Sequence, residues 1–310
     1  MRVTSNNMMN SYLKDVQKNL QGMNKINNQI STGNQVNKVS DDPLKAVKIM
    51  NLNNEISDIE RYNSNVDEVN GWLDMTDNAL DKVGTLSSEI KTLLTSISGT
   101  FGKDEMKAVS SEVNEKIKQI WEAFNTSYGG KYIFGGSITD EPPVKVNVDE
   151  NDGTVSLVFR NTNDEGKPNK GLSDNLNVSV SNGINFNYNL NINEVSNSGD
   201  AFDIFEEVSD ALKGDTADFE KLGELSKKLD SYLSDILNQR SVVGARSNTI
   251  QTIKNTNEEN KIEMKGVLSN IQDVDVADAF IKYKSAEMVY TASLQVTAKI
   301  FNNTILDYLR

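Results

Sequence analysis

The chain has 310 residues, and its 32 lysines and arginines against 45 aspartates and glutamates leave a net charge of −13. Such an acidic surface repels the phosphates of nucleic acids and anionic lipids, which argues against both as partners. Cysteine and histidine are absent, which excludes thiol chemistry, histidine-based catalysis and the usual structural zinc sites. No apolar run approaches the roughly 18 residues of a membrane-spanning helix, so we expect no membrane insertion.

The N-terminal segment predicts a helix that pairs with another helix. Apolar residues recur at alternating intervals of four and three positions, the heptad spacing of a coiled-coil seam. Gly33 follows this pattern and should end the helix, because glycine readily adopts the left-handed conformation found at helix C-termini. The predicted seam residues are Met9, Leu13, Val16, Leu20, Met23 and Ile30.

A second helix should begin at Asp41-Asp42-Pro43. Aspartate is a favourable N-cap, and proline fits the first helical position because its missing N–H would be unpaired there anyway. The apolar stripe then continues over residues 49–97, a length typical of a rod. A glycine-containing break precedes a third helix over 106–124, which we expect to fold back antiparallel.

From Lys131 the apolar period changes from that of a helix to the period of two that characterises a strand. Asp152-Gly153 and Asn182-Gly183 each separate two alternating runs, and such dipeptides favour tight hairpin turns. We therefore predict two hairpins that together form one small antiparallel sheet.

Helical patterns return near Ala201 and continue to the C-terminus. A long segment leads to residue 271, although its stretch 254–261 is polar nearly all round. The apolar residues of the final helix are Val276, Phe280, Tyr283, Tyr290, Leu294, Phe301, Ile305 and Tyr308. Because exposed seams are costly, both chain ends should pack, either together in one helical bundle or as a coiled-coil pair that becomes ordered on polymerisation.

These patterns predict a mainly α fold: a long antiparallel helical rod with paired terminal coiled-coil helices and a small antiparallel β insert. The terminal coiled-coil domain would comprise residues 1–40 and 272–310. The rod domain would comprise 41–140 and 196–271, with an outward-facing insert over 141–195.

The sequence offers no convincing catalytic, cofactor or metal site. Gly129-Gly130 and Gly135-Gly136 are expected to be flexible junctions, because no helix follows them as it would in a phosphate-binding loop. Arg240 and Arg246 suggest a charge pair, and Gly244 between them predicts the close approach of another helix.

Several motifs together resemble the bacterial flagellin family. Residues 30–33 and 40–43 are similar to its N-terminal signature, and 243–246 and 273–277 to its C-terminal signatures. The segment Gly130–Gly136 resembles a motif of the hook-associated branch, which forms the junction between hook and filament, rather than of filament flagellins.

This resemblance implies a non-enzymatic adaptor that polymerises into a tubular layer at the end of the bacterial flagellar hook. Its partners would be a neighbouring hook-associated protein, flagellin, and an export chaperone on the C-terminal helix, and no cofactor is implied. The chain would leave the cell through the flagellar export apparatus and reside in the extracellular flagellum. Asp41, Asp42 and Pro43 would form a structural elbow between the first two helices.

Three other functions remain open from the sequence. The chain could be flagellin itself, the subunit of the filament. A carboxylate-based glycoside hydrolase on the insert would need two acidic residues about 5–10 Å apart in a cleft. A coiled-coil signalling rod would form a stable dimer with ordered ends.

Overall fold

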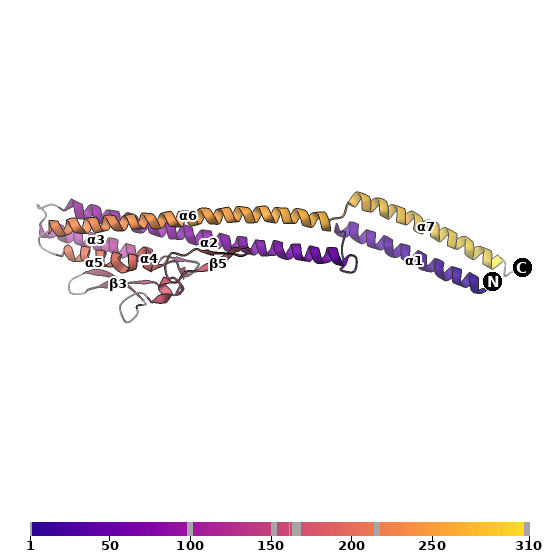
Figure 1. Ribbon diagram of the computed structural model, residues 1–310, viewed down its shortest axis with the longest axis horizontal. Helices are drawn as coiled ribbons and strands as arrows, with labels where there is room; N and C mark the ends of the chain where they lie inside the picture. Colours follow the sequence, from indigo (N-terminus) through magenta and orange to yellow (C-terminus); the bar gives the residue numbers. More distant parts are fainter. Residues whose placement is uncertain are drawn as a thin grey trace. The chain divides into compact units, whose positions relative to one another are not determined.

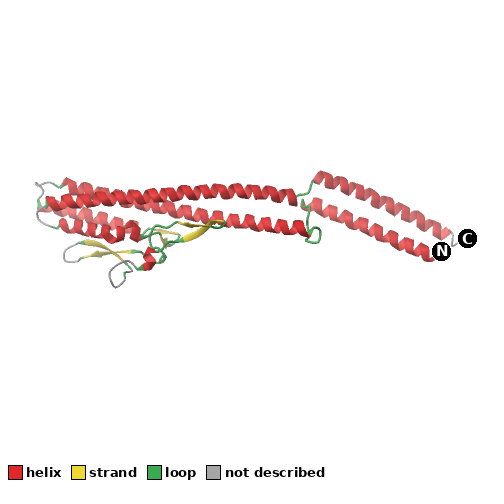
Figure 2. Cartoon of the chain, in the orientation of Figure 1, coloured by secondary structure: helices red, strands yellow, loops and turns green. Residues whose placement is uncertain are grey.

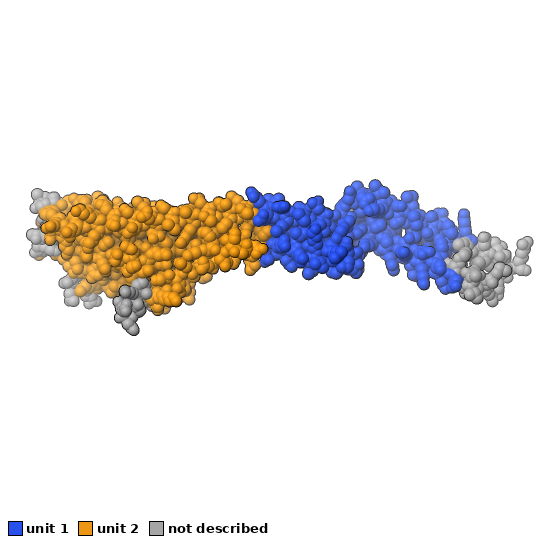
Figure 3. All heavy atoms as spheres, in the orientation of Figure 1, with its two compact units in different colours: residues 1–58, 259–310 blue, residues 59–258 orange. Residues whose placement is uncertain are grey.

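The computed structural model describes residues 2–97, 102–149, 154–160, 162, 169–213 and 218–306. The chain divides into two compact units, coloured separately in Figure 3. Unit 1 contains residues 1–58 and 259–310, and unit 2 contains residues 59–258. Unit 1 combines the two ends of the chain, as their expected pairing requires, whereas unit 2 is one continuous segment.

Helices dominate the described residues, and strands occur only in the middle of the chain (Figures 1 and 2). The α-helices are α1 (Arg2–Thr32), α2 (Pro43–Ser96), α3 (Lys103–Phe124), α4 (Ile192–Val195), α5 (Asp200–Ala211), α6 (Phe219–Gln272) and α7 (Val276–Leu306). The strands are β1 (Ser127–Tyr128), β2 (Lys131–Tyr132), β3 (Val144–Val148), β4 (Val155–Phe159), β5 (Asn177–Ser181) and β6 (Ile184–Asn187). Two 3₁₀ turns are η1 (Lys170–Ser173) and η2 (Asn197–Gly199). The predicted mainly α fold is confirmed.

The predicted signals at the end of α1 and the start of α2 act as expected. Gly33 follows α1 with φ +74°, the left-handed conformation that ends a helix. Pro43 is the first residue of α2, and the Asp42 carboxylate accepts a hydrogen bond from the Lys45 backbone N–H at 3.1 Å. Asp42 is therefore the N-cap of α2.

In unit 2, α2 runs antiparallel to both α3 and α6 (Figure 1). Between α2 and α3, Lys116 pairs with Glu89 at 2.7 Å and Lys82 with Glu122 at 4.0 Å, so the numbering rises along one helix as it falls along the other. Between α2 and α6, Arg240 bridges Asp77 and Asp81, as expected of a charge pair, and Lys254 pairs with Asp67. Fully buried apolar residues fill the interior, among them Leu80, Ile90, Ile117, Phe124, Phe134 and Phe205.

The expected single β-sheet is wrong, because the strands form three separate two-stranded hairpins. β3 pairs with β4 from Val144↔Phe159 to Val148↔Val155, and β5 pairs with β6. The predicted turn at Asn182-Gly183 is present, with Gly183 at φ +73°, whereas Asp152-Gly153 lies outside the described residues. The hairpins do not join because helices cover their apolar faces: β3 and β4 contact α3 and α5.

A third hairpin, which the sequence did not predict, occupies the expected flexible junction. β1 and β2 are joined by Gly129 and Gly130, both at positive φ. Two consecutive left-handed residues are characteristic of a tight type I′ turn, whose twist matches that of the strands. These glycines therefore have a defined conformational role.

The polar stretch 254–261 of α6 is helical, and contacts with α2 and β5 satisfy its residues Asn257 and Glu258. Asn257 is 1% exposed and donates a hydrogen bond at 2.8 Å to the Val180 carbonyl of β5. Asn63 of α2 donates to Glu258 at 2.6 Å. The close approach expected at Gly244 is wrong, since no neighbouring side chain lies within 4 Å of a Cβ built there.

Gly136 should be among the most sensitive positions for stability. Its φ of +62° disfavours any side chain, and an added Cβ would lie 2.3 Å from the Gly171 carbonyl oxygen. Strain and steric overlap together should lower the free energy of unfolding of Gly136→Ala by about 2–5 kcal/mol. Gly183→Ala is the matched control, because φ is +73° but nothing lies within 4 Å, and it should cost only about 1 kcal/mol. Equal losses in urea denaturation would contradict this account.

Candidate assembly interface

The terminal helices α1 and α7 pack against each other within unit 1. The Tyr12 hydroxyl donates a hydrogen bond to the Ser293 carbonyl, and at the other end the Val274 N–H donates to the Gly33 carbonyl at 2.8 Å. The Gln35 N–H donates to the Gln272 carbonyl at 2.6 Å. These contacts make the pair antiparallel and connect the residues that follow α1 with those that precede α7.

The seam of α1 includes four of the six predicted residues. Met9, Val16, Met23 and Ile30 are half-buried, whereas Leu13 and Leu20 are 45% and 37% exposed. The remaining seam positions are occupied by Tyr12, Asn19 and Ile26, which are half-buried. Each of them lies one residue before the position that the sequence pattern predicted. The intervals between the half-buried residues still alternate between three and four positions, as in a heptad. The observed seam is therefore adjacent to the predicted one and shares about half of its residues.

The seam of α7 is also displaced from the predicted one. Tyr283 and Tyr290 are half-buried as expected, but Val276, Phe280 and Leu294 are exposed. The side chains of Phe301 and Ile305, and all of Tyr308, lie outside what the structure describes. Seam positions that the prediction missed carry small or hydroxyl-bearing side chains and give little apolar signal: Ala279, Ala286, Ser293 and Thr297.

Exposed apolar side chains extend around most of the remaining circumference of α7. Val276, Phe280 and Leu294 flank one side of the seam, and Val289 and Val296 flank the other. Ile281 and Met288, 68% and 65% exposed, project from the opposite face. A helix that is apolar on all sides is characteristically buried on all sides, yet α1 covers only one side of α7.

The predicted elbow residues hold the connection between α1 and α2. The Asp41 carboxylate forms an ion pair with Lys25 of α1 at 3.0 Å and accepts a hydrogen bond from the Lys38 N–H at 3.1 Å. The Lys25 ammonium, and then the backbone N–H donors, hold the pKa of Asp41 below its usual value. Asp42 and Pro43 begin α2, so each of the three residues has a structural role.

The segment Gly130–Gly136 also has a structural role, in unit 2. Ile133 and Phe134 are fully buried, and the Phe134 carbonyl accepts a hydrogen bond from the Ile192 N–H at 2.9 Å. The segment thereby connects the end of α3 with α4. Within the described ranges, no cluster of acidic residues could hold a metal ion, and no helix is long and apolar enough to cross a membrane.

Comparison with known families accounts for the two terminal helical regions. The bacterial flagellin N-terminal helical region matches residues 3–139, and the bacterial flagellin C-terminal helical region matches residues 226–309. The chain belongs to the bacterial flagellin family. Both matches include the helix that contributes the seam at that end of the chain.

Within this flagellin family, the chain is similar to hook-associated proteins. It is 20% identical to flagellar hook-associated protein 3 of Salmonella typhimurium, over 98% of this chain and 96% of that protein. A hook-associated protein structure from Vibrio parahaemolyticus has a TM-score of 0.64 at 20% identity, covering 75% of this chain and 100% of that one. The flagellar junction protein FlgL of Legionella pneumophila has a TM-score of 0.55 at 13% identity, covering 73% and 99%. These structures share the fold.

The exposed leucines of α1 should matter for assembly and not for the monomer. Replacing both Leu13 and Leu20 by serine should change the free energy of unfolding by less than about 1 kcal/mol, because both side chains are already exposed. The same change should weaken self-association in sedimentation velocity experiments. The matched double variant Val16→Ser/Met23→Ser alters the α1–α7 seam and should reduce helicity in the monomer. Unchanged self-association of the leucine variant would exclude this face from the interface.

The contact between Lys25 and Asp41 should stabilise unit 1 only while Asp41 is ionised. Because folding lowers the pKa of Asp41, its contribution is complete above the unfolded value of about 3.9 and is lost as the pH falls through the folded value. A double-mutant cycle with Lys25→Gln and Asp41→Asn should therefore show coupling at pH 7 that disappears near pH 2. Coupling that persists at pH 2 would rule out an ionic origin.

Proposed function

We propose that this chain is a non-enzymatic structural adaptor that joins the flagellar hook to the flagellin filament. The observation that carries the proposal is the similarity to Salmonella hook-associated protein 3 over nearly the full length of both chains. The Gly130–Gly136 segment adds support, because it resembles the hook-associated branch of the family more than filament flagellins. Flagellin itself is the second candidate, since the matched helical regions are named for it.

The adaptor would assemble by burying the apolar surface that the α1–α7 pair leaves exposed. Burial of one large apolar side chain contributes about 1.5–3 kcal/mol. Among the side chains of α7 that the structure describes, seven are large, apolar and exposed: Val276, Phe280, Ile281, Met288, Val289, Leu294 and Val296. Further copies of the same helix pair would cover these faces in a tubular inner layer. Residues 1–40 and 272–310 would then form the inner domain, residues 41–140 and 196–271 the surrounding rod, and residues 141–195 the outer insert.

Transport and partner binding complete the proposal. The chain would leave the cell through the flagellar export apparatus, and an export chaperone would cover α7 before assembly. The exposed apolar side chains of α7 support such protection, because large apolar patches promote aggregation. In the flagellum, one end of the layer would contact a neighbouring hook-associated protein or the hook and the other would contact flagellin.

Deletion of the gene in its source organism tests the proposal. We expect cells with hooks but no filaments, and flagellin shed into the medium, because filament subunits would have no surface on which to polymerise. Plasmid-borne wild type should restore filaments, whereas the Leu13→Ser/Leu20→Ser variant should restore them poorly. Export of the variant, checked in the medium, separates an assembly defect from a transport defect.

Other phenotypes would overturn the junction role. Hooks without flagellin, either inside the cell or in the medium, would make this chain the filament subunit. Intact filaments and normal swimming, in a strain with no second gene of this type, would show that the chain is not required at the junction.

A further inference from the structure

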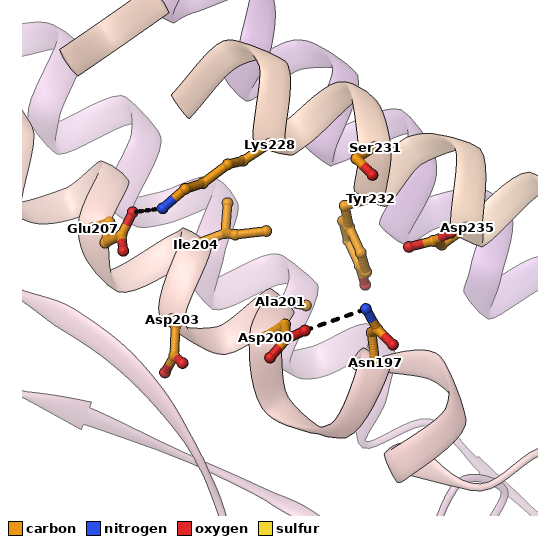
Figure 4. A pocket seen from close by; sticks show the side chains of 10 residues that line it. All are labelled: Asn197, Asp200, Ala201, Asp203, Ile204, Glu207, Lys228, Ser231, Tyr232 and Asp235. Atoms are coloured by element: carbon orange, nitrogen blue, oxygen red, sulfur yellow. Dashed lines mark hydrogen bonds and ion pairs between the residues drawn. The ribbon is translucent and has the colours of Figure 1, made fainter. Parts of the chain in front are cut away.

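A pocket of about 340 Å³ lies within unit 2, between α5 and the N-terminal third of α6 (Figure 4). Asp200, Asp203 and Glu207 line it from α5, and Lys228, Tyr232 and Asp235 line it from α6. The family resemblance assigns no function to this pocket, and it is separate from the terminal helices.

The pocket has an excess of negative charge. Its only lysine, Lys228, is already bound by Glu207, and Asp200 accepts a hydrogen bond from the Asn197 side chain at 3.3 Å. No lysine or arginine among the described residues pairs with Asp203 or Asp235. Of these two carboxylates, Asp235 extends toward Tyr232 without a cation, whereas Asp203 is exposed and points away from it (Figure 4).

The second observation is an unsatisfied hydroxyl group. Tyr232 is 3% exposed, its ring packs edge-to-face on Phe205 at a centroid distance of 5.7 Å, and its hydroxyl has no hydrogen-bond partner among the residues that the structure describes. Figure 4 shows this phenol extending from α6 toward Asn197 and Asp200, among the carboxylates. Burial, and then the nearby Asp235, raise the pKa of Tyr232, so the group stays neutral and its oxygen can accept a hydrogen bond.

We propose that this pocket binds an organic cation with N–H donors, a protonated amine or a guanidinium. The Tyr232 oxygen accepts one N–H hydrogen bond, and the Asp235 carboxylate compensates the charge. Divalent metal ions require several converging oxygen ligands, and no group of three acidic residues among the described ones has that arrangement. This inference is independent of the proposed junction role. The same chemistry could come from a free diamine or from a lysine or arginine side chain of another protein.

NMR of the full-length protein with ¹³C-labelled tyrosine rings tests the proposal, with Tyr232→Phe identifying the resonance. The probes are putrescine, Nα-acetyl-lysine methylamide and Nα-acetyl-arginine methylamide, at constant ionic strength. Tetramethylammonium, a cation without N–H donors, and Mg²⁺ serve as comparisons. We expect the Tyr232 resonance to shift saturably with at least one N–H probe and not with either comparison ion.

Charge variants show whether the pocket carboxylates are responsible. Asp235→Asn should weaken the apparent affinity by about tenfold or more, as loss of a charge-assisted hydrogen bond predicts. Glu206→Gln removes an exposed carboxylate of α5 outside the pocket and should leave the affinity unchanged. Thermal unfolding of each variant confirms that it remains folded.

The results distinguish a free diamine from a protein side chain as the ligand, and some of them would reject the proposal. Tighter binding of putrescine would indicate a free diamine, whereas tighter binding of an acetylated amino acid would indicate a basic side chain, and both support the proposal. Three results would overturn the proposal. The Tyr232 resonance could respond to none of the N–H probes, or respond equally to tetramethylammonium. The third such result is an apparent affinity that Asp235→Asn leaves unchanged.

Discussion

The mismatch in apolar surface between the two terminal helices is the constraint on which unit 1 depends. α1 offers one seam and a neighbouring pair of exposed leucines, whereas α7 is apolar on nearly every side. A two-helix pair can bury only one stripe of each helix, so the monomer retains apolar surface. The end of the helix pair farther from the chain termini is held by two features. One is the elbow at Asp41, Asp42 and Pro43, and the other is the hydrogen bond between Gly33 and Val274.

Unit 2 has a different character, because a continuous apolar core and hydrogen bonds between distant segments hold it together. The β5–β6 hairpin is bound by side chains of the long helices: Asn65 donates to the Ser179 carbonyl and Asn257 to the Val180 carbonyl, both at 2.8 Å. Arg246, expected in a charge pair, donates instead to the Asn189 carbonyl at 2.6 Å. The insert is thus attached to the helices by directional hydrogen bonds as well as by its share of the core.

This division of properties fits a protein that assembles through its ends. A unit with a continuous core and satisfied polar groups can remain folded on its own, whereas a two-helix pair gains most from burial against further helices. The flagellin family matches cover both terminal segments. The Tyr232 hydroxyl is one of five buried side-chain polar atoms without a hydrogen-bond partner among the described residues. It lies beside the carboxylates of a pocket, which is why we assign that pocket a ligand.

Local sequence signals determined the helices, their ends and the hairpin with the Asn-Gly turn, because heptad spacing, N-caps and left-handed glycines act over only a few residues. They also identified the family. Only the tertiary structure decided that Tyr12 and Asn19, rather than Leu13 and Leu20, lie in the seam with α7, since neighbouring heptad seams differ by one residue and the partner helix selects between them. It likewise separated the hairpins, buried Asn257 beside Val180 and gathered the carboxylates around Tyr232. These outcomes depend on contacts between residues distant in the chain, which no local pattern encodes.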